Sequence, residues 1–191
     1  MEVEVDLAAV HGRALGATRA YVAGVRPEQW DDPTPDADWN VRELVSHIVS
    51  GNLWVGELGK GKTIDEVGDL LDHDVLGPDP VAAYDRSAEV ADRTFRAPGA
   101  LEAPFAVSYG PVPGSVYAAH RFIDVLVHGW DLATATGQDA RLDPDLAAAC
   151  LQVVEPQAAA LSSSGAFGTA LDVPADAGAQ TRLLALLGRR G

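Results

Sequence analysis

Four polar residues on one predicted helix have the types and the spacing of a metal site. They are His120, Asp124, His128 and Asp131. A helix turns by about 100° per residue, so Asp124 and His128 are neighbours one turn apart, with the other two close to the same line. Imidazole and carboxylate groups are common ligands of zinc and iron. The stripe predicts that Asp124 and His128 bind a divalent ion together with a third ligand from another helix.

The other faces of this helix are apolar, which predicts that the polar stripe is buried. The apolar residues are Phe122, Ile123, Val125, Leu126, Val127, Trp130, Leu132 and Ala133. An unpaired carboxylate or imidazolium is costly in such surroundings, and a bound ion would compensate it. The alternative is that Asp124 and His128 bond to each other or to the backbone without a metal. Trp130 is expected to be a core residue.

His47 is the predicted third ligand. It lies on a second helix that starts after Asn40, an N-cap whose capping-box partner is Glu43. The apolar residues of this helix are Val41, Leu44, Val45, Ile48, Val49, Leu53 and Trp54. His47 falls among them and therefore faces the core, either as an ordinary core histidine or as a ligand. The predicted metal ligands are thus His47, Asp124 and His128, with His120 as a rival third ligand.

His120 and Asp131 are candidates for supporting roles, and no catalytic residue is assigned. Either side chain would orient a ligand imidazole through a hydrogen bond, or move a proton. Alternatively, Asp131 has a purely structural role and pairs with an arginine such as Arg42 or Arg121. Cys150 is expected to be inert core filler because the sequence shows no electropositive neighbourhood for it.

The spacing of apolar residues along the rest of the chain predicts an all-α bundle of four main helices, followed by shorter helices. The expected helices cover about 6–23, 40–54, 80–95 after the N-cap Asp79, and about 115–136 with Ser115 as N-cap. Shorter helices are expected at 143–154, ended or kinked by Pro156, and at about 177–187. We expect one domain over 1–191, with the bundle core at about 5–137 and a helical extension at about 143–191.

The segments between the helices are expected to be loops. The loop 26–39 is rich in Pro and Asp, with Trp30 and Trp39 as core plugs, and 59–62 is a turn without the spacing of a P-loop. Segment 100–114 is predicted as a loop or short hairpin across the mouth of the bundle. Residues 162–165 are predicted as a loop and 167–173 as extended chain.

Composition excludes several classes of protein. Of 191 residues, 28 are acidic and 14 are basic, a net charge of −14, which argues against a nucleic-acid surface. No apolar run approaches the ~20 residues of a membrane helix, and the acidic start lacks the order of a signal peptide. We expect a cytoplasmic protein with a small-molecule substrate. The sequence leaves homodimerisation through an apolar helix face open.

Two segments resemble a known family. Residues 39–49, Trp-Asn-Val-Arg-Glu-Leu-Val-Ser-His-Ile-Val, resemble the "W-x-V-R-x-L-x-x-H" helix of the DinB-like metal-binding proteins of the mycothiol-dependent maleylpyruvate isomerase group. Residues 124–137 resemble the second motif of the small actinobacterial branch of that group, and parts of 167–189 also fit this branch. The resemblance implies a DinB-like four-helix bundle that holds a divalent metal with His47, Asp124 and His128.

Three protein ligands would leave an open coordination position, which is typical of a catalytic metal. Two neutral imidazoles and one carboxylate leave a divalent ion with a net positive charge, which favours a hydroxide or thiolate as fourth ligand. A thiol bound there would lose its proton, and the resemblance suggests mycothiol as the thiol. The leading hypothesis is a metal- and thiol-dependent S-transferase or isomerase of a small electrophile, with zinc favoured over nickel or iron.

Two other functions remain open from the sequence. One is a metal-dependent hydrolase that uses a metal-bound hydroxide, which would need no thiol. The other is a non-enzymatic metal-binding or stress-response module. This last hypothesis would gain support if segment 100–114 covered the metal.

Overall fold

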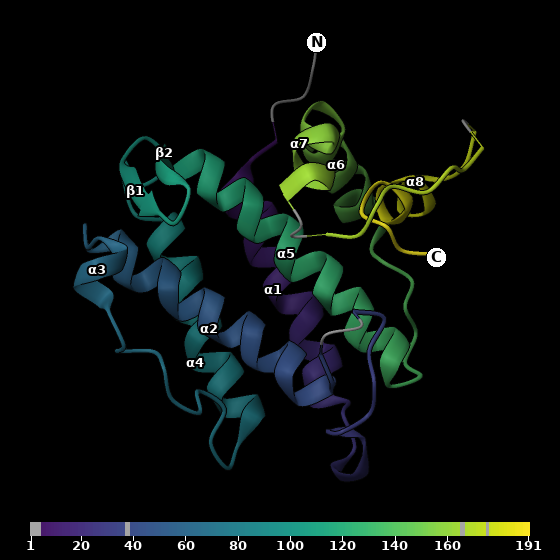
Figure 1. Cartoon of the computed structure of the whole chain (residues 1–191), viewed down its shortest axis with the longest axis horizontal. Coiled ribbons are helices and arrows are strands. Elements are labelled where there is room, and N and C mark those ends of the chain that lie inside the picture. Colours follow the sequence, from purple (N-terminus) through teal and green to yellow (C-terminus); the bar gives the residue numbers. More distant parts are fainter. Residues whose placement is uncertain (1–4, 37–38, 165–166, 175) are drawn as a thin grey trace. The chain divides into compact units, whose positions relative to one another are not determined.

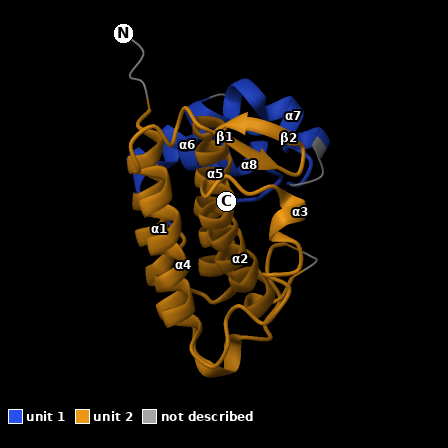
Figure 2. Ribbon diagram, turned by 90° about the vertical axis from the view of Figure 1, so that its left-hand side faces the viewer, with its two compact units in different colours: residues 1, 3, 141–191 blue, residues 2, 4–140 orange. Residues whose placement is uncertain are grey.

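The computed structural model describes residues 5–36, 39–164, 167–174 and 176–191, and it is mostly helical (Figure 1). The chain forms two compact units, one over residues 5–140 and one over residues 141–191 (Figure 2). The all-α fold class is confirmed, and the expectation of a single domain over the whole chain stays a prediction. None of the helices in the described ranges is long and apolar enough to cross a bilayer.

Four helices make the core of the first unit. They are α1 (Leu7–Ala23), α2 (Val41–Gly59), α4 (Pro80–Phe95) and α5 (Gly114–Ala135). Helix α1 packs against α4 and α5, and α2 also packs against α4 and α5. Every helix therefore has two packed neighbours, the arrangement of a four-helix bundle.

Local sequence explains where most of these helices begin. The side chains of Asp6, Asn40 and Asp79 each accept a hydrogen bond from a backbone N–H of the first turn of α1, α2 and α4, respectively. At α2, Glu43 completes the predicted capping box by accepting from the Asn40 N–H at 2.9 Å. The predicted N-cap of α5 is wrong. This helix begins at Gly114 after Pro113, and Ser115 is already inside it.

Close packing between α1 and α5 fixes the helix that carries the polar stripe. The Thr18 hydroxyl of α1 donates to the Val125 carbonyl of α5 at 3.0 Å. A Cβ atom added at Gly129 would lie 2.3 Å from Thr18 Oγ1, so the absence of a side chain at Gly129 permits this approach. Trp130 is buried, as predicted.

Shorter elements complete the first unit. They are η1 (Pro27–Gln29), α3 (Ile64–Val67), β1 (Pro104–Val107) and β2 (Gly110–Pro113). The two strands pair as an antiparallel hairpin, which was one of the two alternatives for this segment. Helix α3 was not predicted, although Thr63 and Glu66 form a capping box at its start.

The second unit contains α6 (Pro144–Val154), η2 (Glu155–Gln157), α7 (Ala158–Ser164) and α8 (Ala179–Leu186), with α6 packed on α8. The predicted loop at 162–165 is wrong for Ser162, Ser163 and Ser164, because α7 continues through them; Gly165 lies outside the described residues. Helix α6 ends before Pro156, as predicted. Cys150 is buried, and burial raises the pKa of its thiol far above the usual value, as expected for core filler.

Candidate metal centre

Helices α2 and α5 bring the three predicted ligands together. His47 Nε2 lies 3.1 Å from Asp124 Oδ1, and His128 Nε2 lies 3.5 Å from the same oxygen. One ligand atom from each of the three residues falls within 4.8 Å of the other two. A tetrahedral ion with bonds of about 2.0–2.2 Å has ligand atoms about 3.3 Å apart. These residues could therefore hold a divalent metal ion with small adjustments.

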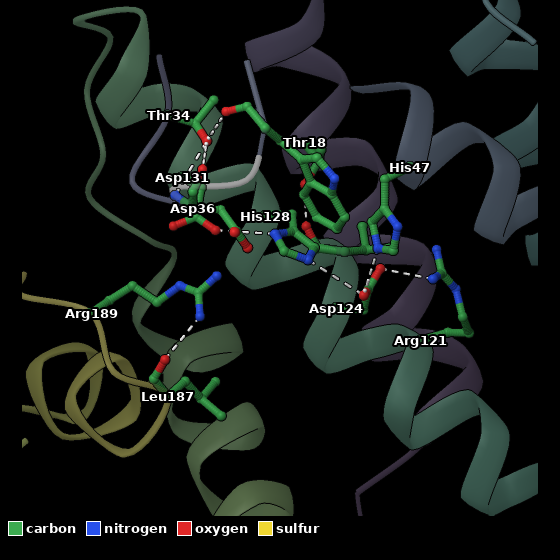
Figure 3. A network of polar contacts seen from close by, with 12 residues as sticks. Thr18, Thr34, Asp36, His47, Arg121, Asp124, His128, Asp131, Leu187 and Arg189 are labelled. Carbon is green, nitrogen blue, oxygen red and sulfur yellow. Dashed lines mark hydrogen bonds and ion pairs between the residues drawn. The ribbon is translucent and has the colours of Figure 1, made fainter. Parts of the chain in front are cut away.

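His128 and three charged groups lie in a row (Figure 3). Asp131 is on one side of the imidazole and Asp124 on the other, and Arg121 lies beyond Asp124. Arg121 Nη1 donates to Asp124 Oδ2 at 2.7 Å. The carboxylate of Asp124 therefore turns one oxygen to the histidines and the other to the guanidinium.

Asp124 stays ionised despite its partly buried position. Burial by itself would raise the pKa of this carboxyl, but the charges of Arg121 and His128, with hydrogen bonds from both histidines, hold it well below its usual range. An ionised carboxylate is the form that binds a metal. Arg121 was missed as part of the site, although its i,i+3 spacing to Asp124 could have indicated the pairing.

Asp131 supports His128 from the opposite side. Its Oδ2 lies 3.0 Å from His128 Nδ1, and the Asp131 side chain is fully buried. An ionised carboxylate only accepts hydrogen bonds, so Nδ1 carries the proton and Nε2 faces Asp124 and His47. Burial would lower the pKa of His128, but the two aspartates raise it to about 9 in the metal-free protein.

A second group of possible ligands shares His128. Asp36, His128 and Asp131 also offer three atoms within 4.8 Å of one another. This group would have to use Nδ1 of His128, because Nδ1 is the ring nitrogen that lies beside Asp131. That nitrogen already donates to Asp131, so we favour the group of His47, Asp124 and His128.

The predictions that Trp30 and Trp39 are core plugs are wrong. Trp30 and Trp39 are both only partly buried. The Trp39 ring stacks on His47 with centroids 4.4 Å apart and meets the His128 ring at 5.5 Å, edge to face. Its position is fixed by local bonds, since the Trp39 N–H donates to the Asp36 carbonyl at 3.1 Å. Trp39 precedes α2, so helical periodicity gave no indication of this contact.

His120 lies on α5 beside the hairpin and is partly buried. Its Nδ1 is 2.5 Å from the Tyr109 hydroxyl. Among the described residues, His120 belongs to neither group of possible ligands, so the structure gives no support to it as a rival third ligand. The two arginines considered as partners of Asp131 have carboxylate partners elsewhere, because Arg42 pairs with Asp74 and Arg121 with Asp124.

The site is open on the side of His47. The side chain of His47 is 34% exposed, that of Asp124 is 18% exposed, and that of His128 is 3% exposed. The hairpin reaches α5 at His120, one turn before Asp124, and it leaves His47 accessible. Segment 100–114 therefore does not seal this site, contrary to what a non-enzymatic module with a covered metal would require.

Comparison with known proteins shows a family and two relatives to which most of this chain is similar. Residues 11–133 match the family described as the mycothiol maleylpyruvate isomerase N-terminal domain. Two relatives, both described as uncharacterized proteins of Mycobacterium tuberculosis, are 39% identical to the chain over 157 residues, which is 80% of this chain and 82% of theirs. No solved structure matches the chain. The matched range contains every residue of the candidate triad.

Proposed function

The chain belongs to the mycothiol maleylpyruvate isomerase N-terminal domain family, and on this premise we propose that it is a metal- and thiol-dependent transferase or isomerase of a small electrophile. His47, Asp124 and His128 would hold the ion. The observation that carries the proposal is the meeting of three ligand atoms from two helices on an accessible side of the bundle.

The donor set fits a divalent ion of intermediate softness. Two imidazoles and one carboxylate suit zinc, and they also suit nickel or iron. Three protein ligands leave room for a further ligand, the pattern of catalytic rather than structural zinc sites. When bound, such an ion would favour the ionised, nucleophilic form of a low-molecular-weight thiol such as mycothiol.

The chain's own residues would prepare the site for this chemistry. Asp131 fixes the orientation of the His128 ring through the hydrogen bond to Nδ1. Trp39 covers one face of the His47 ring and keeps water from that face. His120, next to the Tyr109 hydroxyl and one turn before Asp124, is our candidate to take up the proton that the thiol gives up.

The partner that we propose is a small molecule and not a nucleic acid, because the net charge of −14 would repel phosphates. A cytoplasmic location is also part of the proposal. It agrees with a single cysteine, which cannot form a disulfide within the chain.

The first test is the metal content of the purified full chain. We expect about one divalent ion per chain in the wild type after mild dialysis and little in His128→Ala, because that variant lacks one of three ligands. His73→Ala is the matched control, since His73 is exposed and belongs to neither ligand group. No ion in the wild type, even after zinc or nickel is offered, would overturn the proposal.

The second test separates thiol chemistry from hydrolysis. The metal-loaded protein is given a chromogenic aryl halide or a chromogenic ester, each with and without added thiol. Turnover of the halide that requires both metal and thiol supports the proposal. Ester turnover that is independent of thiol would instead indicate the hydrolase.

A further inference from the structure

The side chain of Arg121 is buried beside the candidate ligands, where it makes hydrogen bonds to Asp124 and to helix α2. Its guanidinium lies inside the bundle, with the residue only 7% exposed. Nη1 donates to Asp124 Oδ2, and Nη2 donates to Asn52 Oδ1 at 3.2 Å and to the Ile48 carbonyl at 3.4 Å. A buried guanidinium is costly unless it is paired, so this position has to be stabilised by its partners.

Helix α2 is shaped to receive this guanidinium. A Cβ atom at Gly51 would lie 2.3 Å from Arg121 Nη1 and 2.5 Å from Cζ. Both distances are far below a normal contact, so the guanidinium packs directly on the backbone of Gly51. Glycine in the middle of a helix lowers helix stability by about 1 kcal/mol relative to alanine. The space for Arg121 explains why α2 has glycine at this point.

The Arg121 contacts continue into a third helix. Asn52 is fully buried and donates through Nδ2 to the Ser87 hydroxyl at 3.3 Å, and Ser87 in turn donates to the Tyr84 carbonyl of α4 at 2.9 Å. The side-chain amide of Asn52 is thus fixed from α4 while it accepts from Arg121. Buried polar groups connected in this way hold a single arrangement.

We propose that Arg121 is a positioning residue of the metal site, which keeps Asp124 a one-oxygen ligand and raises the affinity of the site for an anion as its further ligand. This inference rests on the proposed metal site. It follows from the different partners of the two carboxylate oxygens of Asp124. Arg121 donates to Oδ2, and only Oδ1 faces His47 and His128.

The effect on anion binding follows from counting formal charges. A divalent ion, two neutral imidazoles and the three carboxylates of Asp124, Asp131 and the neighbouring Asp36 would together carry a formal charge of −1, which by itself disfavours an anionic ligand. Arg121 adds one positive charge to this set, at hydrogen-bonding distance from a ligand. A fixed charge in a poorly solvated position changes the binding of another charge much more than that of a neutral molecule. Arg121 therefore offsets the formal negative charge and raises the affinity for ligands such as a thiolate more than for neutral ones.

The test uses the full chain loaded with Co²⁺, whose visible absorption reports the coordination number and the binding of further ligands. Azide serves as the anionic probe and free imidazole as the neutral probe. The variants are Arg121→Met, which removes the charge, Arg121→Lys, which keeps it, and Gly51→Ala, which displaces the guanidinium. Gly16→Ala on α1 is the matched control, because a Cβ atom there meets nothing within 4 Å.

In Arg121→Met we expect azide affinity to fall by about tenfold, and imidazole affinity to change little. The absorption should also weaken, as in a site of higher coordination number, because Asp124 Oδ2 becomes free to bind the ion. Arg121→Lys should recover most of the azide affinity. Gly51→Ala should lower azide affinity in the same direction, and Gly16→Ala should match the wild type.

Equal losses of azide and imidazole affinity in Arg121→Met would overturn the inference, since they would indicate general damage to the site. Wild-type azide affinity in that variant would also overturn it. If Arg121→Met does not fold, Gly51→Ala decides, and identical behaviour of Gly51→Ala and Gly16→Ala contradicts the inference. A wild-type chain that binds no Co²⁺ or zinc would instead contradict the proposed function.

Discussion

Two buried histidines of the same bundle, His11 on α1 and His128 on α5, have opposite tendencies to take up a proton. His11 is fully buried, its ring meets Phe95 edge to face at 5.1 Å, and neither ring nitrogen has a hydrogen-bond partner among the described residues. Burial lowers its pKa to about 3, and the charges of Arg121 and Arg96 contribute to this. The pKa of His128 is raised to about 9 by Asp124 and Asp131.

The difference shows that burial does not identify a functional histidine. Burial removes the charge from an imidazole in apolar surroundings, as at His11. A carboxylate on either side restores the charge and prepares the same group to exchange a proton for a metal ion, as at His128. The partners of a histidine therefore distinguish the candidate site from the core.

The largest expected effect is on the pH dependence of metal binding. His128 is protonated at neutral pH in the metal-free protein, so an ion has to displace that proton. Zinc affinity should rise by about 50-fold between pH 7 and pH 9, where half of the His128 side chains are neutral, and level off about 100-fold above its pH 7 value at higher pH. Competition with a chromophoric chelator measures this, with His73→Ala as the control. A flat affinity over this range would show that His128 is already neutral.

The next largest effect on metal affinity is expected when one carboxylate partner of His128 is removed. Asp131→Asn keeps the shape of the side chain but loses the charge that orients the imidazole. Metal affinity should fall by about 10- to 100-fold, as measured by the same competition, while Asp36→Asn should change it little. Equal losses in both variants would place the ion between Asp36, His128 and Asp131 instead.

The smallest expected effect concerns the stability contribution of His11. Its folded pKa is lowered, so the unfolded chain binds a proton that the folded chain does not, and stability falls as the pH drops below about 6.5 toward 3. His11→Leu removes this loss. Between pH 6.5 and pH 5 its free energy of unfolding should gain about 2 kcal/mol relative to the wild type.

Urea unfolding of the metal-free proteins at both pH values measures this difference, and zinc affinity measured in parallel should stay close to that of the wild type. If the difference in free energy of unfolding between His11→Leu and the wild type does not change with pH, the pKa of His11 is not lowered by folding. Loss of zinc binding in His11→Leu would contradict the distinction between the two histidines.

Much of the fold could be predicted because its determinants are local. The caps Asn40, Asp79 and Asp143 stand next to the first turns that they stabilise. Periodicity needs several turns, so it missed the single turn of α3 and the short serine-containing α7. The predicted start of α5 at Ser115 was wrong because Pro113, with its fixed φ, can precede a helix without any side-chain cap.

For the candidate site, the sequence was enough to predict the stripe on α5 and the place of His47 among the apolar residues of α2, because residues three or four apart share a helix face. The prediction that His47 faces the core is wrong in part, since its side chain is 34% exposed. Which groups meet that stripe depends on how the helices pack. The stacking of Trp39, the Gly51 backbone beneath Arg121, and the absence of polar partners at His11 depend on which side chains lie close across helices. Such contacts join residues far apart in the chain, so no spacing in the sequence encodes them.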